Sequence, residues 1–334
     1  MVRGMRSRDS LNLSLPLAAV LVLVFLVAQR AAVQELDPLN PQESSDLETS
    51  VSGPLQRRLE ATFSDSFETG VDIFWESHDC WVSPEVFDWW ALRLAEDDLA
   101  GLTWESAERM LWRISEESPV FSTHRKRRRQ ICAVVGASRN LLGSSYGPLI
   151  DAHDVVIRVN RAPTADYLSD VGEKTTHHVM WPRDLEEHEF DRRAILLINP
   201  ISLHNEDIFD RIVTLAEDDL RWDIGRVRII HPGFVKYVHE SWTEDRGEDY
   251  PSTGFIALMI ALHVCDEVDV FGFGADARGR WDRYYEDYSM DVSTFHPADF
   301  EAQVRWEMDE KGILKVFRGN RPDPSSRPDA SPKN

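Results

Sequence analysis

Short, almost continuous apolar runs alternate along this chain with stretches of helical character. The runs lie at 131–135, 155–159, 194–198, 227–230 and 268–273. Runs of this length and composition are typical of strands that are buried on both faces of a sheet. The clearest helical stretches between and after them are 254–264 and 298–310. The alternation predicts an α/β fold with a mostly parallel central sheet and helices on both faces, in which ligands lie beyond the carboxyl ends of the strands.

The N-terminal region carries an uncharged stretch at 11–29, which follows three arginines in residues 1–10. At roughly 1.5 Å per residue, a helix of that length matches the ~30 Å hydrocarbon core of a bilayer. Because the arginines precede the stretch, residues 1–10 are expected in the cytosol and the rest of the chain in the lumen. A cleaved signal peptide is the alternative, since Ala28 and Ala31 are small enough for a cleavage site. Either reading delivers the main domain to the secretory pathway.

Composition changes divide the remaining chain into three parts. Residues 30–70 are acidic and contain three prolines, which is typical of a flexible stem, and the proline-containing end at 321–334 is predicted to be disordered. The part between them, 71–320, has the length of a single α/β domain. The chain holds 58 acidic and 37 basic residues, for a net charge of −21. Such a surface repels phosphate backbones, so we expect no nucleic-acid partner.

One candidate site follows the first apolar run, where the strand enters a loop hinged at Gly136. Glycine allows close approach of a ligand to the backbone, and Ser138 and Asn140 offer hydrogen bonds. The loop lacks the G-x-G-x-x-G spacing of a dinucleotide site and the Gly-Lys-Ser/Thr of a phosphate loop. A purely structural glycine would explain the same pattern.

A second candidate precedes the apolar helix at 254–264. Ser252 or Thr253 is placed to cap that helix, whose free N–H groups and positive dipole end could bind an anion. An ordinary helix cap is the alternative explanation.

A third candidate is His296, which stands before Pro297 at the expected start of the helix at 298–310. A helix N-terminus disfavours the protonated imidazole and so suits a general base, although Asp299 and Glu301 act in the opposite direction. A capping or surface histidine is the alternative. The chain contains no D-x-D triplet, which disfavours a transferase that holds its sugar nucleotide through a divalent cation bound by that motif.

Four ordered motifs give the chain a resemblance to a known family. A long motif spans 132–174 with Ser-Ser-Tyr-Gly-Pro at 144–148, a short motif spans 251–274, Arg-Tyr-Tyr-Glu lies at 283–286, and His-x4-Glu lies at 296–301. In this order the motifs resemble those of the animal-type sialyltransferases, and are most similar to the α2,3-sialyltransferases that act on Gal-β1,3-GalNAc.

The resemblance implies a GT-A-like variant of the α/β fold and transfer of sialic acid from CMP-sialic acid to the 3-hydroxyl of a terminal galactose. It implies a single-pass Golgi membrane protein whose catalytic domain is lumenal and needs no metal or other cofactor. His296 matches the catalytic base, and Cys132 matches the partner of Cys265 in a disulfide, which leaves Cys80 unpaired or intermolecular. The residues that match or lie beside donor and substrate contacts are Ser138, Asn140, Asn160, Tyr250, Ser252, Thr253, Gly254, Gly274 and Arg283.

Three departures from the family pattern keep other functions open. Ala137 replaces an asparagine, Arg283 replaces a histidine and Trp181 replaces a tyrosine. The alternatives are a different acceptor or linkage, a related CMP-sugar donor, and a non-catalytic glycan-binding protein on the same fold. Tyr237 and Trp242 could stack on sugar rings, but packing in the core would explain them equally well.

Overall fold

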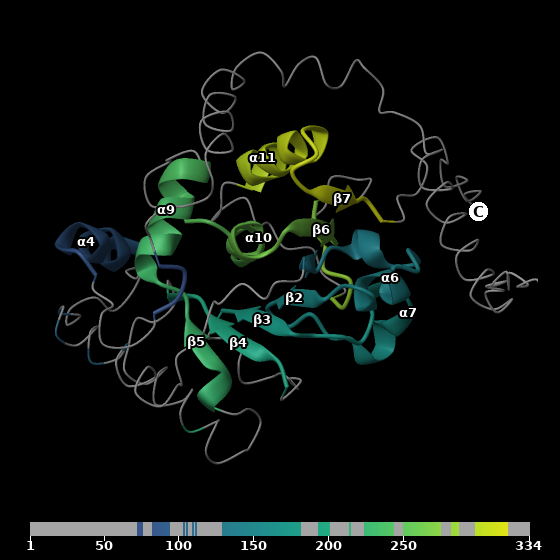
Figure 1. The fold of residues 1–334 in the computed structure, drawn as a ribbon, viewed down its shortest axis with the longest axis horizontal. Helices are drawn as coiled ribbons and strands as arrows, with labels where there is room; N and C mark the ends of the chain where they lie inside the picture. The colour runs from purple at the N-terminus through teal and green to yellow at the C-terminus, as the bar shows by residue number, and fades with distance from the viewer. Residues whose placement is uncertain are drawn as a thin grey trace, which may run out of the picture. The chain divides into compact units, whose positions relative to one another are not determined.

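In a computed structural model of the protein, the described residues form a parallel β-sheet with helices packed against it (Figure 1). These residues are 72–75, 82–93, 103, 105, 109, 111, 129–181, 193–200, 214, 224–243, 250–274, 282–286 and 298–319. Their seven strands are β1 (Ile131–Val135), β2 (Val155–Val159), β3 (His177–Met180), β4 (Ile195–Ile198), β5 (Val227–Ile229), β6 (Glu267–Phe271) and β7 (Lys315–Phe317). The order across the sheet is β5-β4-β3-β2-β1-β6-β7, and every neighbouring pair is parallel. The predicted α/β fold with a mostly parallel sheet is confirmed.

The five predicted strands correspond to β1, β2, β4, β5 and β6, whereas β3 and β7 were not predicted. The sequence of β3 opens with His177 and His178, which interrupt the apolar pattern, although His178 is buried. The sequence of β7 is three residues long and begins with Lys315, which is exposed at the edge of the sheet. A charged residue at an edge position is common in strands that have a neighbour on one side only.

The helices and 3-10 turns connect these strands. Among the described residues they are α4 (Pro84–Arg93), η1 (Arg139–Leu141), α6 (Gly147–Asp151), η2 (Ala165–Tyr167), α7 (Leu168–Val171), η5 (Ile224–Arg226), α9 (Pro232–Trp242), α10 (Thr253–Val264) and α11 (Ala298–Glu310). The predicted helices at 254–264 and 298–310 correspond to α10 and α11. Helix α10 is apolar around its whole circumference because it is buried from Phe255 to Leu262 and packs against β1, β2, β3 and β6.

Helices cover both faces of the sheet, as alternate residues of β1 show. Ala133 and Val135 pack in one cluster with Ile150 of α6 and Val171 of α7. Cys132 lies between them in sequence and forms a disulfide with the residue that follows α10, so it faces the other side. Figure 1 shows α6 and α7 grouped together, with α10 next to β6.

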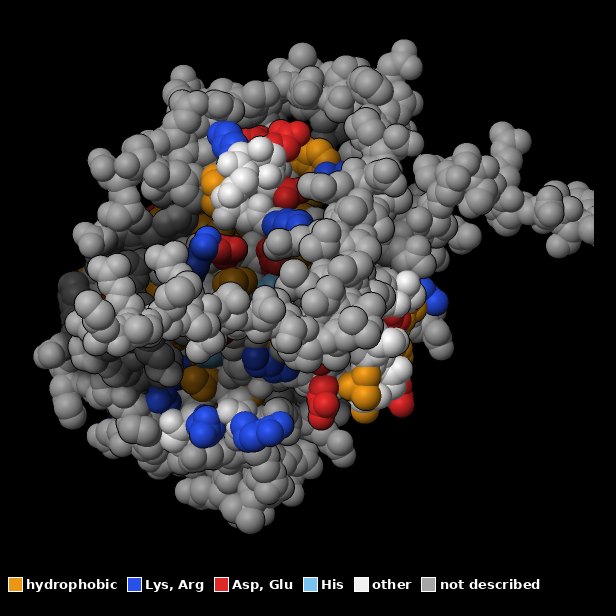
Figure 2. Space-filling view, turned by 45° about the vertical axis from the view of Figure 1, so that its right-hand side comes forward, with side chains coloured by type: hydrophobic (Ala, Val, Ile, Leu, Met, Phe, Trp, Pro, Cys, Tyr) orange, Lys and Arg blue, Asp and Glu red, His pale blue; other side chains and the backbone are white. Residues whose placement is uncertain are grey.

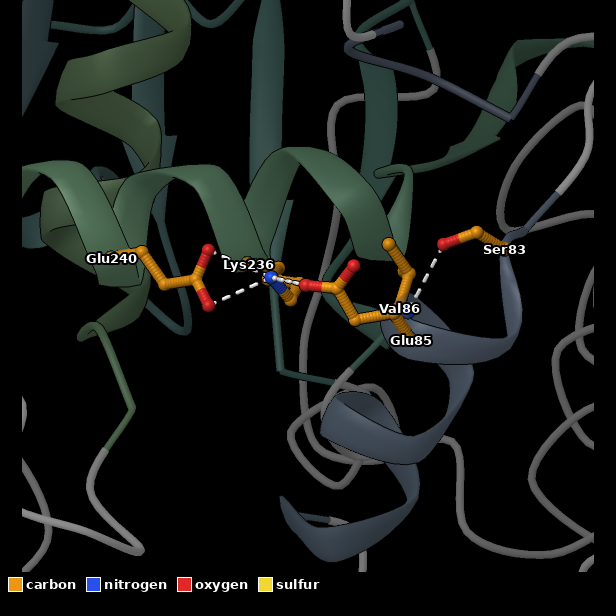
Figure 3. Close-up of polar contacts among 5 residues, drawn as sticks. All are labelled: Ser83, Glu85, Val86, Lys236 and Glu240. Atoms are coloured by element: carbon orange, nitrogen blue, oxygen red, sulfur yellow. Dashed lines mark hydrogen bonds and ion pairs between the residues drawn. The ribbon is translucent and has the colours of Figure 1, made fainter.

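Helix α4 is attached to α9 by a ring contact, with the centroids of Trp89 and His239 5.5 Å apart, and by one lysine. Ser83 caps the start of α4 by accepting a hydrogen bond from the backbone N–H of Val86 at 3.2 Å. The ammonium of Lys236 in α9 then lies 3.0 Å from the carboxylate of Glu85 and 2.7 Å from that of Glu240 (Figure 3). The side chain of Glu85 is 81% exposed, so this ion pair contributes little to stability.

The predicted tail, span and stem at 1–70 and the predicted C-terminal tail at 321–334 lie outside the described residues and stay predictions. Within the described part of the chain, no helix combines the length and apolar character that crossing a membrane requires.

Candidate donor site

A cavity opens where the order of strands in the sheet reverses. Strands β2 to β5 follow β1 outward on one side, and β6 lies on the other side of β1, so the reversal falls between β1 and β6. Open parallel sheets bind ligands at this point, beyond the carboxyl ends of the strands. The cavity has a volume of ≈ 170 Å³ and is lined by Gly136, Ala137, Ser138, Val159, Ser252, Gly254, Gly272, Phe273, Gly274, Asp282, Arg283, Glu301 and Arg305.

The loops that follow β1 and β6 are hydrogen-bonded to each other across the floor of the cavity. Ser138 donates its backbone N–H to the carbonyl oxygen of Gly272 at 2.9 Å and its hydroxyl to the carbonyl oxygen of Gly274 at 2.8 Å. A Cβ atom on Gly136 would overlap the Gly272 carbonyl oxygen, and Gly274 has a φ of +97°. The glycines are therefore required by the close approach of the loops and by a left-handed backbone.

Asn140 supports the same loops from behind the cavity. It lies in η1, is 3% exposed, and donates from Nδ2 to the carbonyl oxygen of Phe273 at 3.1 Å. No donor among the described residues reaches its Oδ1 atom. A buried acceptor without a partner is costly, and Asn140 does not line the cavity, so its role in this structure is to hold the loop after β6 through Phe273.

The start of α10 carries a cap that is itself held by α11. Ser252 accepts a hydrogen bond from the backbone N–H of Phe255 at 3.1 Å, so it is Ser252 that caps the helix through its side chain, and Thr253 is the first helical residue. Ser252 also donates its backbone N–H and its hydroxyl to the two carboxylate oxygens of Glu301, at 2.7 and 2.6 Å. Burial raises the pKa of Glu301 to about 7, against the hydrogen bonds from Ser252, which lower it.

Asn160 and Tyr250 lie beside the cavity and not in its wall. Asn160 has a φ of +49°, and its Oδ1 accepts from the backbone N–H of Trp181 at 3.1 Å. The Trp181 ring stacks on Tyr250, with the ring centroids 5.8 Å apart and the planes at 13°. Thr253 is also absent from the cavity lining and is 7% exposed.

Arg283 enters the cavity from the segment at 282–286, which lies along the loop after β1. Ser138 and Arg283 form an antiparallel bridge, and the backbone N–H of Tyr284 donates to the carbonyl oxygen of Ala137 at 2.9 Å. The guanidinium donates from Nη1 to Glu286 at 3.0 Å.

The structure thus brings five predicted site residues into one cavity, namely Ser138, Ser252, Gly254, Gly274 and Arg283. It also contains the predicted disulfide between Cys132 and Cys265, whose Cα atoms are 6.1 Å apart. His296 and Cys80 lie outside the described residues. Trp242 is fully buried and donates to the Tyr237 hydroxyl at 3.0 Å, so it belongs to the core.

Eight further lining residues were not predicted as site residues, and those with a charged or aromatic side chain are Phe273, Asp282, Glu301 and Arg305. For Glu301 and Arg305 the sequence did contain a signal: they lie four residues apart in the predicted helix at 298–310, and residues with that spacing share a face of a helix.

On the face drawn in Figure 2, basic and acidic side chains of the described residues lie close together. Across the described ranges, no three His, Cys, Asp or Glu side chains are grouped as a metal site would require.

Known proteins that are similar to this chain in sequence and in structure are sialyltransferases. The profile of glycosyltransferase family 29 (sialyltransferase) matches residues 81–313. The CMP-N-acetylneuraminate-beta-galactosamide-alpha-2,3-sialyltransferase 2 of Rattus norvegicus is 36% identical over 270 residues, which cover 77% of this chain and 76% of the relative. The corresponding sialyltransferase 1 of Homo sapiens is 33% identical over 276 residues, covering 79% and 80%.

A crystal structure of a mammalian sialyltransferase in complex with Gal-beta-1-3GalNAc-ortho-nitrophenol has a TM-score of 0.65 and 30% identity to this chain. The match covers 79% of this chain and 96% of that one. The family profile spans well over half of the chain, and the relatives match it across most of their length. This protein therefore belongs to glycosyltransferase family 29, the sialyltransferases.

Proposed function

We propose that this protein transfers sialic acid from CMP-sialic acid to the 3-hydroxyl of a terminal galactose, with Gal-β1,3-GalNAc as the acceptor. The observation that carries the proposal is its similarity to β-galactosamide α2,3-sialyltransferases along more than three quarters of the chain. The complex of a similar sialyltransferase with Gal-beta-1-3GalNAc-ortho-nitrophenol supports the acceptor. The cavity at the reversal of strand order supports a nucleotide donor, because sheets of this kind bind nucleotides there.

The donor end of the reaction depends on stabilising CMP as it leaves. The leaving group is a phosphate monoester, which hydrogen-bond donors and a helix N-terminus can stabilise. The capped start of α10 and the guanidinium of Arg283 both line the cavity and supply such groups. Arginine stays protonated at any physiological pH, so Arg283 would act through its charge and not as a proton donor. We expect transfer to proceed without an added divalent metal or other cofactor.

The acceptor end needs a base, and His296 has this role in the proposal. It takes the proton from the 3-hydroxyl of galactose while that oxygen attacks the anomeric carbon from the face opposite CMP. The anomeric configuration is inverted through an oxocarbenium-like transition state. General-base catalysis contributes ~10²–10⁴-fold, so the change His296→Ala is expected to lower kcat by at least about 100-fold.

The test is a transfer assay with CMP-sialic acid and three acceptors: Gal-β1,3-GalNAc, N-acetyllactosamine and lactose. Transfer to the first acceptor is expected to continue in EDTA and to be lost in His296→Ala. Preference for another acceptor would overturn the assigned specificity. If the protein binds CMP but does not cleave CMP from CMP-sialic acid with any of the acceptors, the result would favour a glycan-binding protein. Ala137 and Arg283 are then the departures to revert first, to asparagine and histidine.

We also propose that the protein is a type II membrane protein of the Golgi, anchored by residues 11–29. The apolar stretch and the arginines that precede it support this orientation. A tag at the C-terminus of the full chain should resist protease in sealed microsomes and become sensitive when detergent is added. A tag that is digested without detergent would contradict the orientation.

A further inference from the structure

Arg305 is a buried cation in the wall of the cavity. It lies on α11 one turn after Glu301, is 8% exposed, and its guanidinium carbon is 5.4 Å from the centre of the Phe273 ring. Burial lowers the pKa of Arg305 to about 10, so the side chain remains protonated near neutral pH. Taking a guanidinium out of water is costly unless charged or polar groups compensate it.

The described residues provide only part of that compensation: the guanidinium lies over the Phe273 ring, and the charge of Glu301 raises the pKa of Arg305 against the larger, opposite effect of burial. Both carboxylate oxygens of Glu301 accept hydrogen bonds from Ser252, and Glu301 forms no ion pair with Arg305 within 4.0 Å in the described structure. Its charge is also incomplete near neutral pH, because burial raises the pKa of this carboxyl to about 7. Arg283, the other arginine of the cavity, differs in having a carboxylate partner in Glu286 at 3.0 Å.

Gly274 leaves the space beside the guanidinium open. A Cβ atom at this position would lie 3.7 Å from Nη2 of Arg305, so any longer side chain would reach the guanidinium. The backbone of Gly274 is held there by the hydroxyl of Ser138. The side of the guanidinium that faces Gly274 therefore remains accessible to a ligand in the cavity.

We infer that Arg305 is a specificity-determining residue of the donor site, which binds an anionic group of CMP-sialic acid. This inference rests on the proposed function. The donor carries two such groups, the phosphate and the carboxylate of the sialic acid, and both match the paired donors of a guanidinium. The buried cation is then compensated when the donor is bound.

The test compares the full chain with Arg305→Gln, which removes the charge. Affinities for cytidine and for CMP are measured by calorimetry, and KM for CMP-sialic acid is measured in the transfer assay. If Arg305 binds the phosphate, its replacement should weaken CMP by roughly 10- to 100-fold and leave cytidine within about twofold. If it binds the carboxylate, CMP should keep its affinity and KM for CMP-sialic acid should rise by a similar factor. Arg305→Lys should recover part of the loss in either case.

Arg318→Gln is the matched control, because Arg318 also covers an aromatic ring, with its guanidinium carbon 4.3 Å from the centre of Trp306, but does not line the cavity. It should change none of the three values. If Arg305→Gln does not fold, Arg305→Met keeps a long unbranched side chain without the charge and should show the same loss of binding.

Two results would overturn the inference. One is an equal loss of affinity for cytidine and CMP, which would indicate a structural role or a contact with the base. The other is unchanged affinity for CMP together with unchanged KM for CMP-sialic acid in a wild-type protein that binds and transfers normally. Wild-type protein that binds no CMP would overturn the proposed function itself and this inference with it.

Discussion

Replacing Cys132 and Cys265 together by alanine is expected to lower the free energy of unfolding by up to about 5 kcal/mol. The disulfide joins residues that are 133 positions apart. In the chain-entropy model, closing a loop of that length removes roughly 5 kcal/mol of conformational freedom from the unfolded chain at 25 °C. The folded state should change less, because other contacts already hold both backbones. Cys132 is paired with Val155 and Val268 on either side, and the N–H of Cys265 donates to the last turn of α10.

Urea denaturation, followed by tryptophan fluorescence and by circular dichroism, measures this loss. Mass spectrometry of the alkylated wild-type protein should first establish that Cys132 and Cys265 are oxidised. Cys80→Ala is the matched control and should leave the unfolding midpoint unchanged. An unchanged midpoint in the double variant would refute the reasoning, because the loop would then be restricted in the unfolded state by something other than the bond.

Three further perturbations have outcomes that the structure specifies. Burial raises the pKa of Glu301 from 4.5 to about 7, so its contribution to stability is present below pH 4.5 and is lost as the pH rises through 7. The free energy of unfolding should fall by roughly 3 kcal/mol over that range. Thermal unfolding of Glu301→Gln should show no such fall. Both ring nitrogens of His153 face acceptors, one of them Asp269 at 3.1 Å, and although burial lowers its pKa, these contacts raise it overall above 6.5. The contribution of His153 to stability is present below pH 6.5 and is lost as the pH rises through its raised pKa. Asp269→Asn should therefore reduce the dependence of the free energy of unfolding on pH in this range, and an unchanged pH dependence would contradict the ion pair. Gly136→Ala should abolish CMP binding and lower the melting temperature, since its Cβ would overlap the backbone of Gly272; full affinity would contradict the loop geometry.

The sequence predicted most of the sheet because buried strands leave a direct compositional signal. The runs at β1 and β2 were predicted at their observed bounds. Arg158 in β2 is the instructive residue, since it is 1% exposed and yet charged. Its guanidinium donates to the carbonyl oxygens of Val171, Gly172 and Lys174, which come from a later segment of the chain. Compensation of this kind is a property of the tertiary structure, and hydropathy along the chain does not report it.

The site was predicted where a residue's role depends on its neighbours in sequence, as with Ser252 at the start of a helix. It was missed where the role depends on contacts across the fold. Glu301 holds Ser252 from 49 positions away, and Arg305 reaches the cavity only because α11 packs beside the loop after β6. Asn160 is intermediate, because the motif singled it out, whereas its left-handed backbone and its bond to Trp181 appear only in the structure.

The most direct test of the proposed reaction is to determine the product by NMR after incubating the purified protein with CMP-sialic acid and Gal-β1,3-GalNAc. The account predicts one product, with sialic acid linked to the 3-hydroxyl of galactose in the anomeric configuration opposite to that of the donor. A product that retains the donor configuration, or that is linked through another hydroxyl, would contradict the mechanism or the specificity, and release of CMP without a sialylated product would contradict transfer itself.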